Sequence, residues 1–484
     1  MPGRMDDGAE DSRSDWNADT ITDRFMGSSV PSSPRDRTDN GLPEATLSAG
    51  KDRAGPPPDS FAMQRTTSAL NAATAVTPRR LQMKMPLEDL TVIDLSHALA
   101  GPHCSTMLAD YGAQVIKLET PGSGDIARAW GTMLPSGESS YFVSLHRNKK
   151  GISIDLKSAR GKALFFALIK KADVVLENFR PGTLQKLGLD YEQARQHNPG
   201  IIYCSVSGFG QDGPYRDRAA LDLILQAESG MLSVTGEEGG PAVRCGVSIA
   251  DLTAGMYAAF GILMALRVKE KTGAGQHIDV SMLEGQMSLL NIMLASFFAD
   301  GEVPGPMGTA YKALLPYQTF RTRTRDLALA VGSEKLWKTF CPVIGRPDLC
   351  DDPRFRTNRD RMKHRNALIQ TLQDIFLTRS FEEWESLLLE AGIPIGAINN
   401  LGQLVEHPQV KARDSLVDTV HPKAGPVRMV GVPVRLSATP GAVRSPSPSL
   451  GEHTAEILRT VLEMDEAEIE QLIREGVVQQ AGAA

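Results

Sequence analysis

The sequence predicts an α/β protein, and three observations lead to this prediction. Short apolar segments rich in Val and Ile alternate with helical segments of about 10–15 residues, as in βαβ units with parallel strands. A Gly- and Pro-rich stretch at residues 300–316 interrupts this alternation. The 484 residues are also too many for one compact core. We therefore expect a Rossmann-like large domain with a mostly parallel sheet, followed by a smaller α/β domain.

The first strand is expected where TVIDL follows Leu90, and it runs into a turn and a helix that ends near Tyr111. Further strands are predicted at 114–119, 152–157, 173–178, 201–207 and 276–282, with a helix at 159–171 and a long apolar helix after the last strand. Parallel sheets bind ligands outside the carboxyl ends of their strands. The expected binding region is therefore formed by the loops 97–102, 178–182 and 208–214.

Residues 300–316 are the predicted domain boundary. After it, the sequence predicts strands at 317–323 and 327–332, helices at 334–344, 364–377 and 381–391, a strand within 392–400, paired strands around 427–436 and a terminal helix at 452–475. The expected divisions are an N-terminal extension at 1–85, the first part of the large domain at 86–299, the small domain at 300–400 and a segment returning to the large domain at 401–484.

Residues 1–85 differ in composition from the rest of the chain. They are rich in Ser, Pro, Gly and Asp and lack an apolar period, so they cannot bury enough surface to offset the entropy of ordering. We expect this extension to be disordered. The part after Met63 is basic and acid-free, which faintly resembles an organelle presequence but equally fits an unselected upstream extension. The expected compartment is the cytoplasm, with the mitochondrial matrix as the alternative.

Charge and composition exclude several classes of partner. The formal charge of −6 gives no general basic field, so we expect no nucleic-acid partner. No run of about 20 uninterrupted apolar residues occurs, so we expect no membrane span. The five cysteines form no C-x-x-C pair, which indicates reduced thiols and predicts no metal site.

One carboxylate stands out, at the start of an apolar helix of about four turns predicted within residues 252–266. This carboxylate, Asp251, follows Gly246 and Ser248. It can be an N-cap that accepts free N–H groups of the first turn. It can also be a reactive group held at the mouth of a buried helix. The local sequence leaves both interpretations open.

Two glycine patterns resemble a dinucleotide-binding fingerprint, which requires a strand, a tight turn and a helix N-terminus in succession. The pattern from Gly208 to Gly213 follows a strand, but Pro214 comes next and no helix is predicted there. The pattern from Gly122 to Ala127 follows the second strand rather than the first. An NAD-dependent enzyme is therefore a weak alternative.

Basic side chains gather in the first half of the chain, at Arg147, Lys149, Lys150, Lys157, Arg180 and Lys186. Each by itself is typical of a solvated surface. Arg180 lies in ENFRPG, a strand-end loop where a guanidinium can bind phosphate through paired donors. A ligand with several phosphates would explain the group.

A set of motifs resembles the class III coenzyme A transferases, the family that contains formyl-CoA transferase and carnitine CoA-transferase. The matching segments are VIDLSHALAGP, VIKLETPGSGD, RNKKGISIDLK, ADVVLENFRPG, GFGQDGPY, GVSIADLTAGMYA, KTGAGQHIDVSM, LPYQTF and LGEHTAEIL. They occur in the family's order over nearly all the chain from about Leu87 to Gln480. The chain is most similar to the succinate–hydroxymethylglutarate type of dicarboxylate CoA-transferase.

The resemblance implies that Asp251 is the catalytic nucleophile. It would attack an acyl-CoA, expected to be succinyl-CoA, and form a mixed anhydride that the released CoA thiolate converts into an aspartyl-CoA thioester. An acceptor acid, expected to be dicarboxylic, would then take over the CoA. The coenzyme A thioester is a substrate in this scheme, and no permanently bound cofactor or metal is expected.

The resemblance also predicts where coenzyme A binds and how the chain assembles. His97, Ala98 and Leu99 would lie near the thioester, and the nucleotide would run along Ile154, Lys157, Asn178, Phe179, Thr183 and Lys186. Arg180 matches an arginine of the related racemases, and we include it among the CoA-binding residues. The family fold implies a homodimer of two interlocked subunits.

Departures from the family bear on the substrate. Leu99 stands where formyl-CoA transferases have a glutamine, and their glycine-rich lid is absent, which disfavours formate and oxalate. Tyr311, followed by Lys312, occupies the position of a histidine common in the dicarboxylate type. Lys312 or Arg244 could pair with a remote carboxylate of the acceptor, although both are equally typical of a surface.

Two other functions are possible for such a chain. The α-methylacyl-CoA racemases share the fold but need a histidine base immediately before the acid that matches Asp222. That position is Leu221, which cannot transfer a proton, so transfer is favoured over racemisation. A non-catalytic acyl-CoA binding protein is the other alternative, and the intact Asp251 argues against it.

Overall fold

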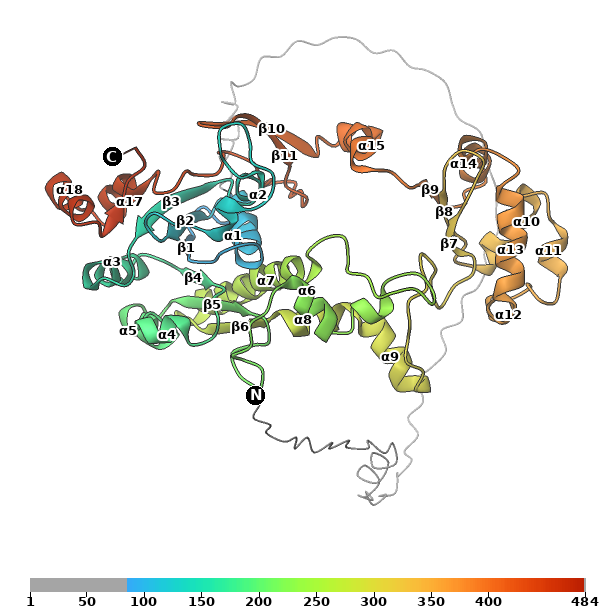
Figure 1. Cartoon of the computed structure of the whole chain (residues 1–484), viewed down its shortest axis with the longest axis horizontal. Helices are drawn as coiled ribbons and strands as arrows, with labels where there is room; N and C mark the ends of the chain where they lie inside the picture. Colours follow the sequence, from blue (N-terminus) through green and yellow to red (C-terminus); the bar gives the residue numbers. More distant parts are fainter. Residues whose placement is uncertain (1–84, 483–484) are drawn as a thin grey trace, which may run out of the picture. The chain divides into compact units, whose positions relative to one another are not determined.

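The computed structural model describes residues 85–482, which contain a seven-stranded sheet with the order β12-β3-β2-β1-β4-β5-β6 (Figure 1). All neighbouring strands are parallel except β12, which runs antiparallel to β3. The strands are β1 (Thr91–Asp94), β2 (Gln114–Glu119), β3 (Lys149–Ile154), β4 (Val174–Glu177), β5 (Ile202–Ser207), β6 (His277–Ser281) and β12 (Val478–Gln479). The predicted α/β fold with a mainly parallel sheet is confirmed. The predicted disorder of residues 1–85 lies, except for Met85, outside the described residues.

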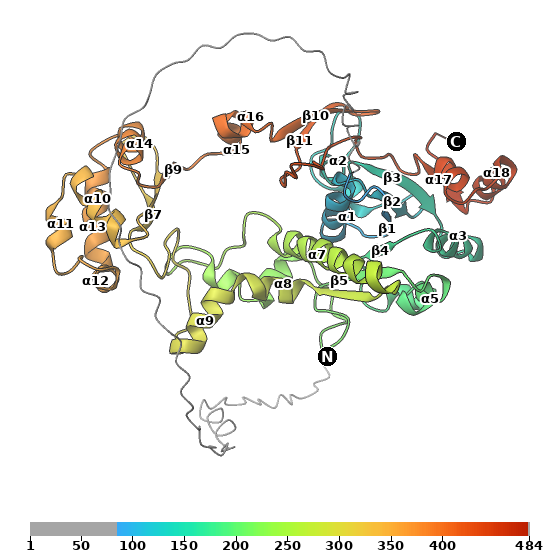
Figure 2. The same ribbon diagram turned by 180° about the vertical axis from the view of Figure 1, so that it is seen from behind.

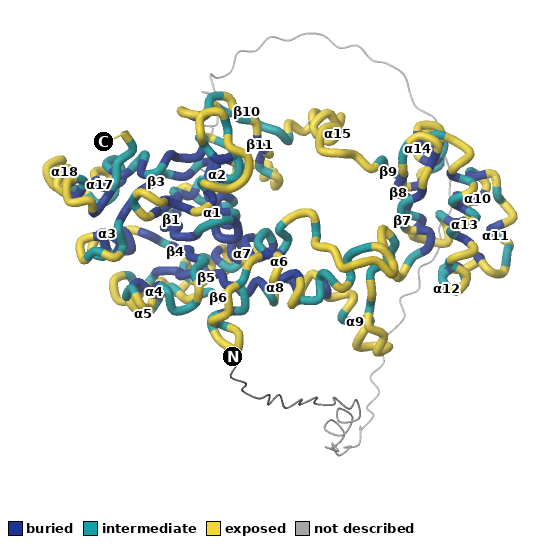
Figure 3. Tube along the Cα trace, viewed as in Figure 1, coloured by how far each residue is buried: buried dark blue, intermediate teal, exposed yellow. Residues whose placement is uncertain are grey.

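Helices cover both faces of the sheet (Figures 1 and 2). One face carries α1 (Ala100–Asp110), α6 (Asp222–Glu228) and α7 (Ile249–Thr272); the other carries α3 (Ala159–Ile169), α4 (Thr183–Leu187), α5 (Tyr191–His197), α17 (Thr454–Thr460) and α18 (Glu466–Arg474). Successive strand residues point to opposite faces, so Val92 belongs to one core and Ile93 to the other. The inner strands β1, β2, β4 and β5 are therefore buried on both sides, whereas the edge strand β6 is partly exposed (Figure 3).

The direction of strand addition reverses between β1 and β4. From β1 the chain builds outward through β2 and β3, and then returns to add β4, β5 and β6 on the other side. A ligand crevice is expected at such a reversal, outside the carboxyl ends of the two strands. The loops 97–102 and 178–182 follow β1 and β4, so the topology brings two of the three predicted binding loops together.

A second, antiparallel sheet contains β7 (Tyr317–Phe320), β8 (Leu327–Ala330) and β9 (Ile395–Ala397). It shares a core with α10 (Glu334–Val343), α13 (Arg365–Phe376) and α14 (Phe381–Glu390), in which Trp337, Phe340 and Trp384 are buried. The remaining elements are α11 (Asp348–Asp351), α12 (Asn358–Lys363), α15 (Leu401–Glu406), α16 (Pro408–Ala412) and a hairpin of β10 (Leu416–His421) and β11 (Gly425–Val430). The domain limits at residues 299 and 400 stay predictions.

Several predicted element boundaries were wrong. Strand β3 begins at Lys149 rather than at 152, and it ends where Asp155 accepts the N–H of Lys157 and Ser158 caps α3. The predicted terminal helix at 452–475 is two helices, because Asp465 starts α18 with its own capping box. The paired strands predicted around 427–436 are the β10–β11 hairpin, which ends at Val430.

The apolar helices also differ from expectation. The long helix predicted after β6 is broken into α8 (Met282–Leu289) and α9 (Asn291–Asp300), which are bent by 67°. Helix α7 spans 24 residues, longer than predicted, and by length and composition it could cross a membrane. However, 44% of its apolar window is buried inside the protein, and the core helix of a globular protein passes the same test.

Candidate active site

A cavity of about 300 Å³ lies at the reversal point of the sheet. It is lined by residues from the three predicted loops and by the start of α7, among them His97, Ala98, Ala100, Asn178, Phe179, Arg180, Arg218, Leu221 and Asp251. The predicted nucleophile and five of the ten predicted CoA-binding residues therefore line one cavity.

Asp251 does not cap its helix, so the N-cap interpretation was wrong. Helix α7 begins at Ile249, and Asp251 lies within its first turn. The carboxylate of Asp222 performs the capping function, because its Oδ1 accepts the Ala250 N–H at 2.9 Å. The Nε2 of the buried Gln226 donates to Asp222 Oδ2 at 2.6 Å. A neighbouring helix thus supplies the cap and leaves the Asp251 carboxylate free.

The environment of Asp251 disfavours its ionised form. Burial, and then the negative charge of Asp222, raise the pKa of Asp251 to about 7. In residues 85–482, no hydrogen-bond donor contacts its carboxylate. A carboxylate without donors keeps its electron pairs available for attack on an electrophile.

Tyr141, in α2 (Ser140–Leu145), was missed by the sequence analysis. Burial, followed by the charge of Asp251, raises the pKa of the Tyr141 hydroxyl to about 12, which keeps it protonated as a donor. Its ring packs edge-on against Trp130, with centroids 5.8 Å apart. Nothing in the local sequence predicts that this tyrosine lies near Asp251, since 110 positions separate the two residues in the chain.

The two loops at the reversal point are joined by hydrogen bonds. The Asn178 side chain accepts the His97 N–H and donates to the His97 carbonyl, both at 2.8 Å. The rings of His97 and Phe179 lie 5.3 Å apart. Burial, assisted by the positive charge of Lys117, lowers the pKa of His97, so its ring is neutral at pH 7. Asn178 and Phe179 thus support the wall of the cavity that His97 lines.

The other five predicted CoA-binding residues do not line this cavity. Thr183 and Lys186 line a second cavity of about 580 Å³, which shares Arg180 with the first. Lys157 is exposed in the turn after β3. Leu99 and Ile154 are 9% and 0% exposed, so Ile154 presents neither its side chain nor its backbone to a ligand in this structure.

Arg218 and Arg216 are further basic residues of this region that sequence reasoning did not single out. Arg218 lines the cavity of Asp251, and its guanidinium lies 4.4 Å from the Tyr215 ring centroid. Arg216 lines the cavity of Thr183 and Lys186. The signal was present in the sequence, because both arginines lie shortly after the predicted binding loop 208–214.

Other candidate sites from the sequence are not formed. After the glycine pattern of residues 208–213, the next helix begins only at Asp222, so no helix N-terminus meets a pyrophosphate. Among residues 85–482, no group of three or more His, Cys, Asp or Glu side chains could hold a metal ion.

Comparison with known proteins agrees with this geometry. The family model described as CoA-transferase family III matches residues 87–454. The chain is 38% identical to the succinyl-CoA:glutarate CoA-transferase of Mus musculus, with 82% of this chain and 91% of that one covered. It is also 38% identical to the succinate–glutarate CoA-transferase of Agrobacterium fabrum, with 78% and 95% covered.

A solved structure extends the comparison to three dimensions. The crystal structure of a CAIB/BAIF family protein from Brucella suis matches with a TM-score of 0.70 at 35% identity, and the match covers 78% of this chain and 100% of that chain. Sequence, family and structural comparisons therefore agree that the chain belongs to CoA-transferase family III and is an enzyme that transfers coenzyme A from an acyl-CoA donor to a carboxylate acceptor.

Proposed function

We propose that this enzyme transfers CoA from succinyl-CoA to a dicarboxylic acid through an aspartyl-CoA thioester on Asp251. The observation that carries the proposal is the Asp251 carboxylate itself, half-buried and without hydrogen-bond donors in the described part of the chain, at a cavity on the reversal point of the sheet. A carboxylate in water is a poor nucleophile. Partial desolvation and a fixed orientation toward the thioester carbonyl make it reactive.

The proposed reaction proceeds in balanced steps. An Asp251 oxygen attacks the thioester carbonyl, the C–S bond breaks, and an aspartyl–succinyl anhydride and CoA thiolate form. The thiolate then attacks the aspartyl carbonyl, which releases succinate and leaves CoA bound to Asp251 as a thioester. An acceptor carboxylate attacks this thioester, and the thiolate attacks the acceptor carbonyl of the new anhydride. The products are acceptor acyl-CoA and free Asp251.

Developing negative charge on the carbonyl oxygen needs donors. At the start of α7, the Ala250 N–H is already bound to Asp222, so this helix offers few free N–H donors to the carbonyl oxygen. Helix α1 begins at Ala100, beside the same cavity, and has no side-chain cap. Its first N–H groups are therefore the donors that we propose for the oxyanion.

The dicarboxylate preference is supported by Arg244 rather than by Lys312. The Lys312 ammonium lies 3.6 Å from Glu302 and 3.9 Å from Asp300, and neither of these carboxylates lines the cavity of Asp251. The Arg244 guanidinium is half-exposed and lies 4.0 Å from Asp222, the residue that caps the helix of Asp251. We infer that Arg244 pairs with the remote carboxylate of the acceptor. The similar enzymes from Mus musculus and Agrobacterium fabrum are named for succinate and glutarate.

The nucleotide of CoA is proposed to leave the cavity past Arg180 toward Thr183 and Lys186. Arg180 borders both cavities, so a single extended ligand can occupy them together. The basic side chains there, including Arg216, match the phosphates of coenzyme A. Lys157 is proposed as a further phosphate contact, because it is exposed in the turn after β3.

A homodimer is supported by the exposed apolar side chains of α7, α8 and α9. Its exposed side chains include Met256, Phe260, Met264, Ile292 and Phe298, the last of which is 77% exposed. Large exposed apolar side chains are typical of protein interfaces, and the family resemblance favours a second copy of the chain as the occupant. Sedimentation equilibrium should give twice the chain mass. A monomer at micromolar concentration would contradict the assembly.

Isotope exchange tests the transfer reaction without knowledge of the physiological acceptor. The enzyme is incubated with unlabelled succinyl-CoA and ¹³C-succinate, and the label in succinyl-CoA is followed by mass spectrometry. Catalysed exchange is expected, since succinate is then both product and acceptor. No exchange above the enzyme-free rate would contradict succinyl-CoA as the donor, and the same assay with other acyl-CoA and acid pairs would identify the right one.

A further inference from the structure

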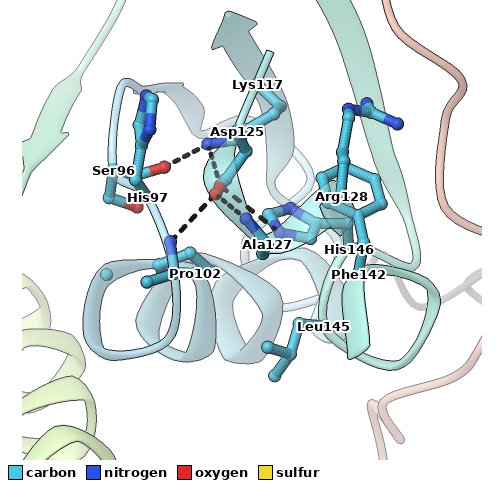
Figure 4. Close-up of polar contacts among 12 residues, drawn as sticks. Ser96, His97, Pro102, Lys117, Asp125, Ala127, Arg128, Phe142, Leu145 and His146 are labelled. Carbon is cyan, nitrogen blue, oxygen red and sulfur yellow. Dashed lines mark hydrogen bonds and ion pairs between the residues drawn. The ribbon is translucent and has the colours of Figure 1, made fainter. Parts of the chain in front are cut away.

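A buried ion pair holds the turn that leads from β1 into α1 (Figure 4). The ammonium of Lys117 donates to the Ser96 carbonyl and lies 3.0 Å from Asp125 Oδ2. The other oxygen of Asp125 accepts the Ala98 N–H at 3.0 Å. Both charged side chains are fully buried. The pair therefore fixes the turn at two successive points of its backbone.

The turn has a conformation that needs such support. Ala98 has a φ of 65°, in the left-handed region that residues with a Cβ rarely adopt. The start of α1 packs directly against the turn, because a Cβ added at Gly101 would lie 2.1 Å from the Cβ of Ser96. A relaxed Ala98 would therefore displace the first residues of α1.

The ion pair belongs to a larger network of polar side chains, all of which are buried. The Ser96 N–H and hydroxyl both donate to Asp94, whose other oxygen lies 3.2 Å from the ammonium of Lys149. The ring of His146 lies 3.9 Å from Asp125 Oδ2. Burial disfavours the Asp125 carboxylate, but the charge of Lys117 together with the Ala127 and Ala98 N–H groups that it accepts lowers the pKa of Asp125. None of the side chains of this network lines the cavity of Asp251.

Stability alone gives little reason to bury these charges. A buried ion pair loses much of its hydration, and well-packed apolar side chains of similar volume often stabilise a fold as well or better. Two contacts of this pair, to the Ser96 carbonyl and the Ala98 N–H, hold the backbone of the turn whose residues His97 and Ala98 line the cavity of Asp251. A third contact, from the Ala127 N–H to Asp125, caps the short helix Ile126–Ala129.

We propose that Lys117 and Asp125 are positioning residues for CoA transfer, which hold Ala98 in its left-handed conformation. Through this turn they fix His97 and the free N–H groups at the start of α1 relative to the thioester. The inference rests on the proposed function of Asp251, but it concerns residues that do not touch the substrate.

The first variant is D125A, which removes both the charge and the acceptor for the Ala98 N–H. Loss of alignment at the reacting centre is expected to lower kcat for the succinyl-CoA exchange by about 100-fold. The KM for succinyl-CoA should change by less than about threefold, because the proposed phosphate contacts lie on other loops. A large rise in KM with an unchanged kcat would overturn the inference.

The second variant, D125A/A98G, tests the turn itself. Glycine adopts positive φ without strain, so it should restore the native turn when the ion pair is lost. We expect the double variant to recover roughly tenfold in kcat over D125A, which corresponds to the usual penalty of the left-handed region for alanine. Failure to recover, with a folded double variant, would overturn the inference.

A matched control comes from the other end of α1. There Asp110 accepts two hydrogen bonds from Arg147, at 2.9 and 2.7 Å, and the pair is almost as deeply buried. Both D110A and D125A should lower the melting temperature, but only D125A should lose kcat and respond to A98G. An equal loss of kcat in D110A would mean that the ion pair of Asp125 acts only through stability.

Crystal structures of the variants test the inference separately from the reaction. In D125A the φ of Ala98 should leave the positive region, and in D125A/A98G residue 98 should return to it. A φ near 65° in D125A would overturn the inference, whatever the activity. Wild-type enzyme without any exchange would instead contradict the proposed function and leave this structural comparison to decide the role of the ion pair.

Discussion

Two aspartates near the same cavity, Asp125 and Asp251, have opposite environments. Asp125 accepts N–H groups from Ala98 and Ala127 and faces the ammonium of Lys117, and its pKa is lowered although burial opposes ionisation. Asp251 receives no hydrogen bond in the described part of the chain, and burial together with Asp222 raises its pKa to about 7.

The difference shows that the surroundings of two chemically identical side chains determine the function of each. An ionised carboxylate that accepts backbone N–H groups and faces an ammonium is a stable anchor for the backbone. A carboxylate that lacks donors is destabilised and is therefore a better nucleophile. The cap supplied by Asp222 makes this possible, since it satisfies the first turn of α7 and leaves Asp251 unused.

The largest expected effect comes from D251N, which removes the nucleophilic carboxylate but keeps the shape of the side chain. Isotope exchange should fall by about 10⁴-fold or more, as is usual when a covalent catalyst is deleted. A variant that kept a tenth of the wild-type exchange would show that Asp251 is not the nucleophile.

The same variant should be more stable than the wild type at alkaline pH. The folded pKa of Asp251 is about 7 against an ordinary value of 3.8, so ionisation penalises the folded state increasingly from pH 4 to 7, and fully above it. D251N should therefore melt roughly 2–4 °C above the wild type at pH 8 and no higher than the wild type at pH 4. Equal melting temperatures at pH 8 would contradict the raised pKa.

The next effect concerns Arg244. R244Q should raise the KM for a dicarboxylate acceptor such as glutarate by roughly tenfold, the usual value of one charged hydrogen bond. The KM for butyrate, which has no second carboxylate, should stay unchanged and serves as the control. K312Q is the matched variant and should alter neither value. If both acceptors responded equally to R244Q, Arg244 would have no role in selecting dicarboxylates.

The smallest effect is a shift in pH dependence. The acid limb of kcat/KM should follow the ionisation of Asp251, with an apparent pKa near 7. D222N keeps an acceptor oxygen for the Ala250 N–H but removes the negative charge that raises the pKa of Asp251. The limb should therefore move to lower pH in D222N. A limb that stayed in place would mean that burial alone sets this pKa.

The sequence was sufficient for six strands of the large sheet and for the loops around the cavity, but it did not predict β12. Alternating apolar segments gave the strands, and the strand ends gave the loops that contain His97 and Asn178. Several element boundaries were placed wrongly from the sequence. The Asp465 capping box split the terminal helix, and the bend at Leu290 divided α8 from α9. Strand β3 begins earlier than predicted, at Lys149, which pairs with Val115 of β2 and is buried in an ionic network that its residue type does not indicate.

For the site, the family motifs identified Asp251, but not what makes it reactive. Asp222 lies 29 positions away in the chain, and only the packing of α6 on α7 brings its carboxylate to the start of α7. Lys117, in the strand VIKLE, looks solvent-facing by its residue type, yet it is fully buried because Asp125 and Ser96 satisfy it. Buried charges with partners distant in the sequence leave no local pattern to predict.

The most direct test of the central claim is to trap the aspartyl intermediate. The protein is incubated with succinyl-CoA, quenched with hydroxylamine and digested with trypsin. Cleavage after Arg244 and Arg267 releases a peptide whose only side-chain carboxylate is Asp251. We predict a hydroxamate on Asp251, and none in D251N. An unmodified Asp251 under conditions in which isotope exchange proceeds would contradict the covalent mechanism.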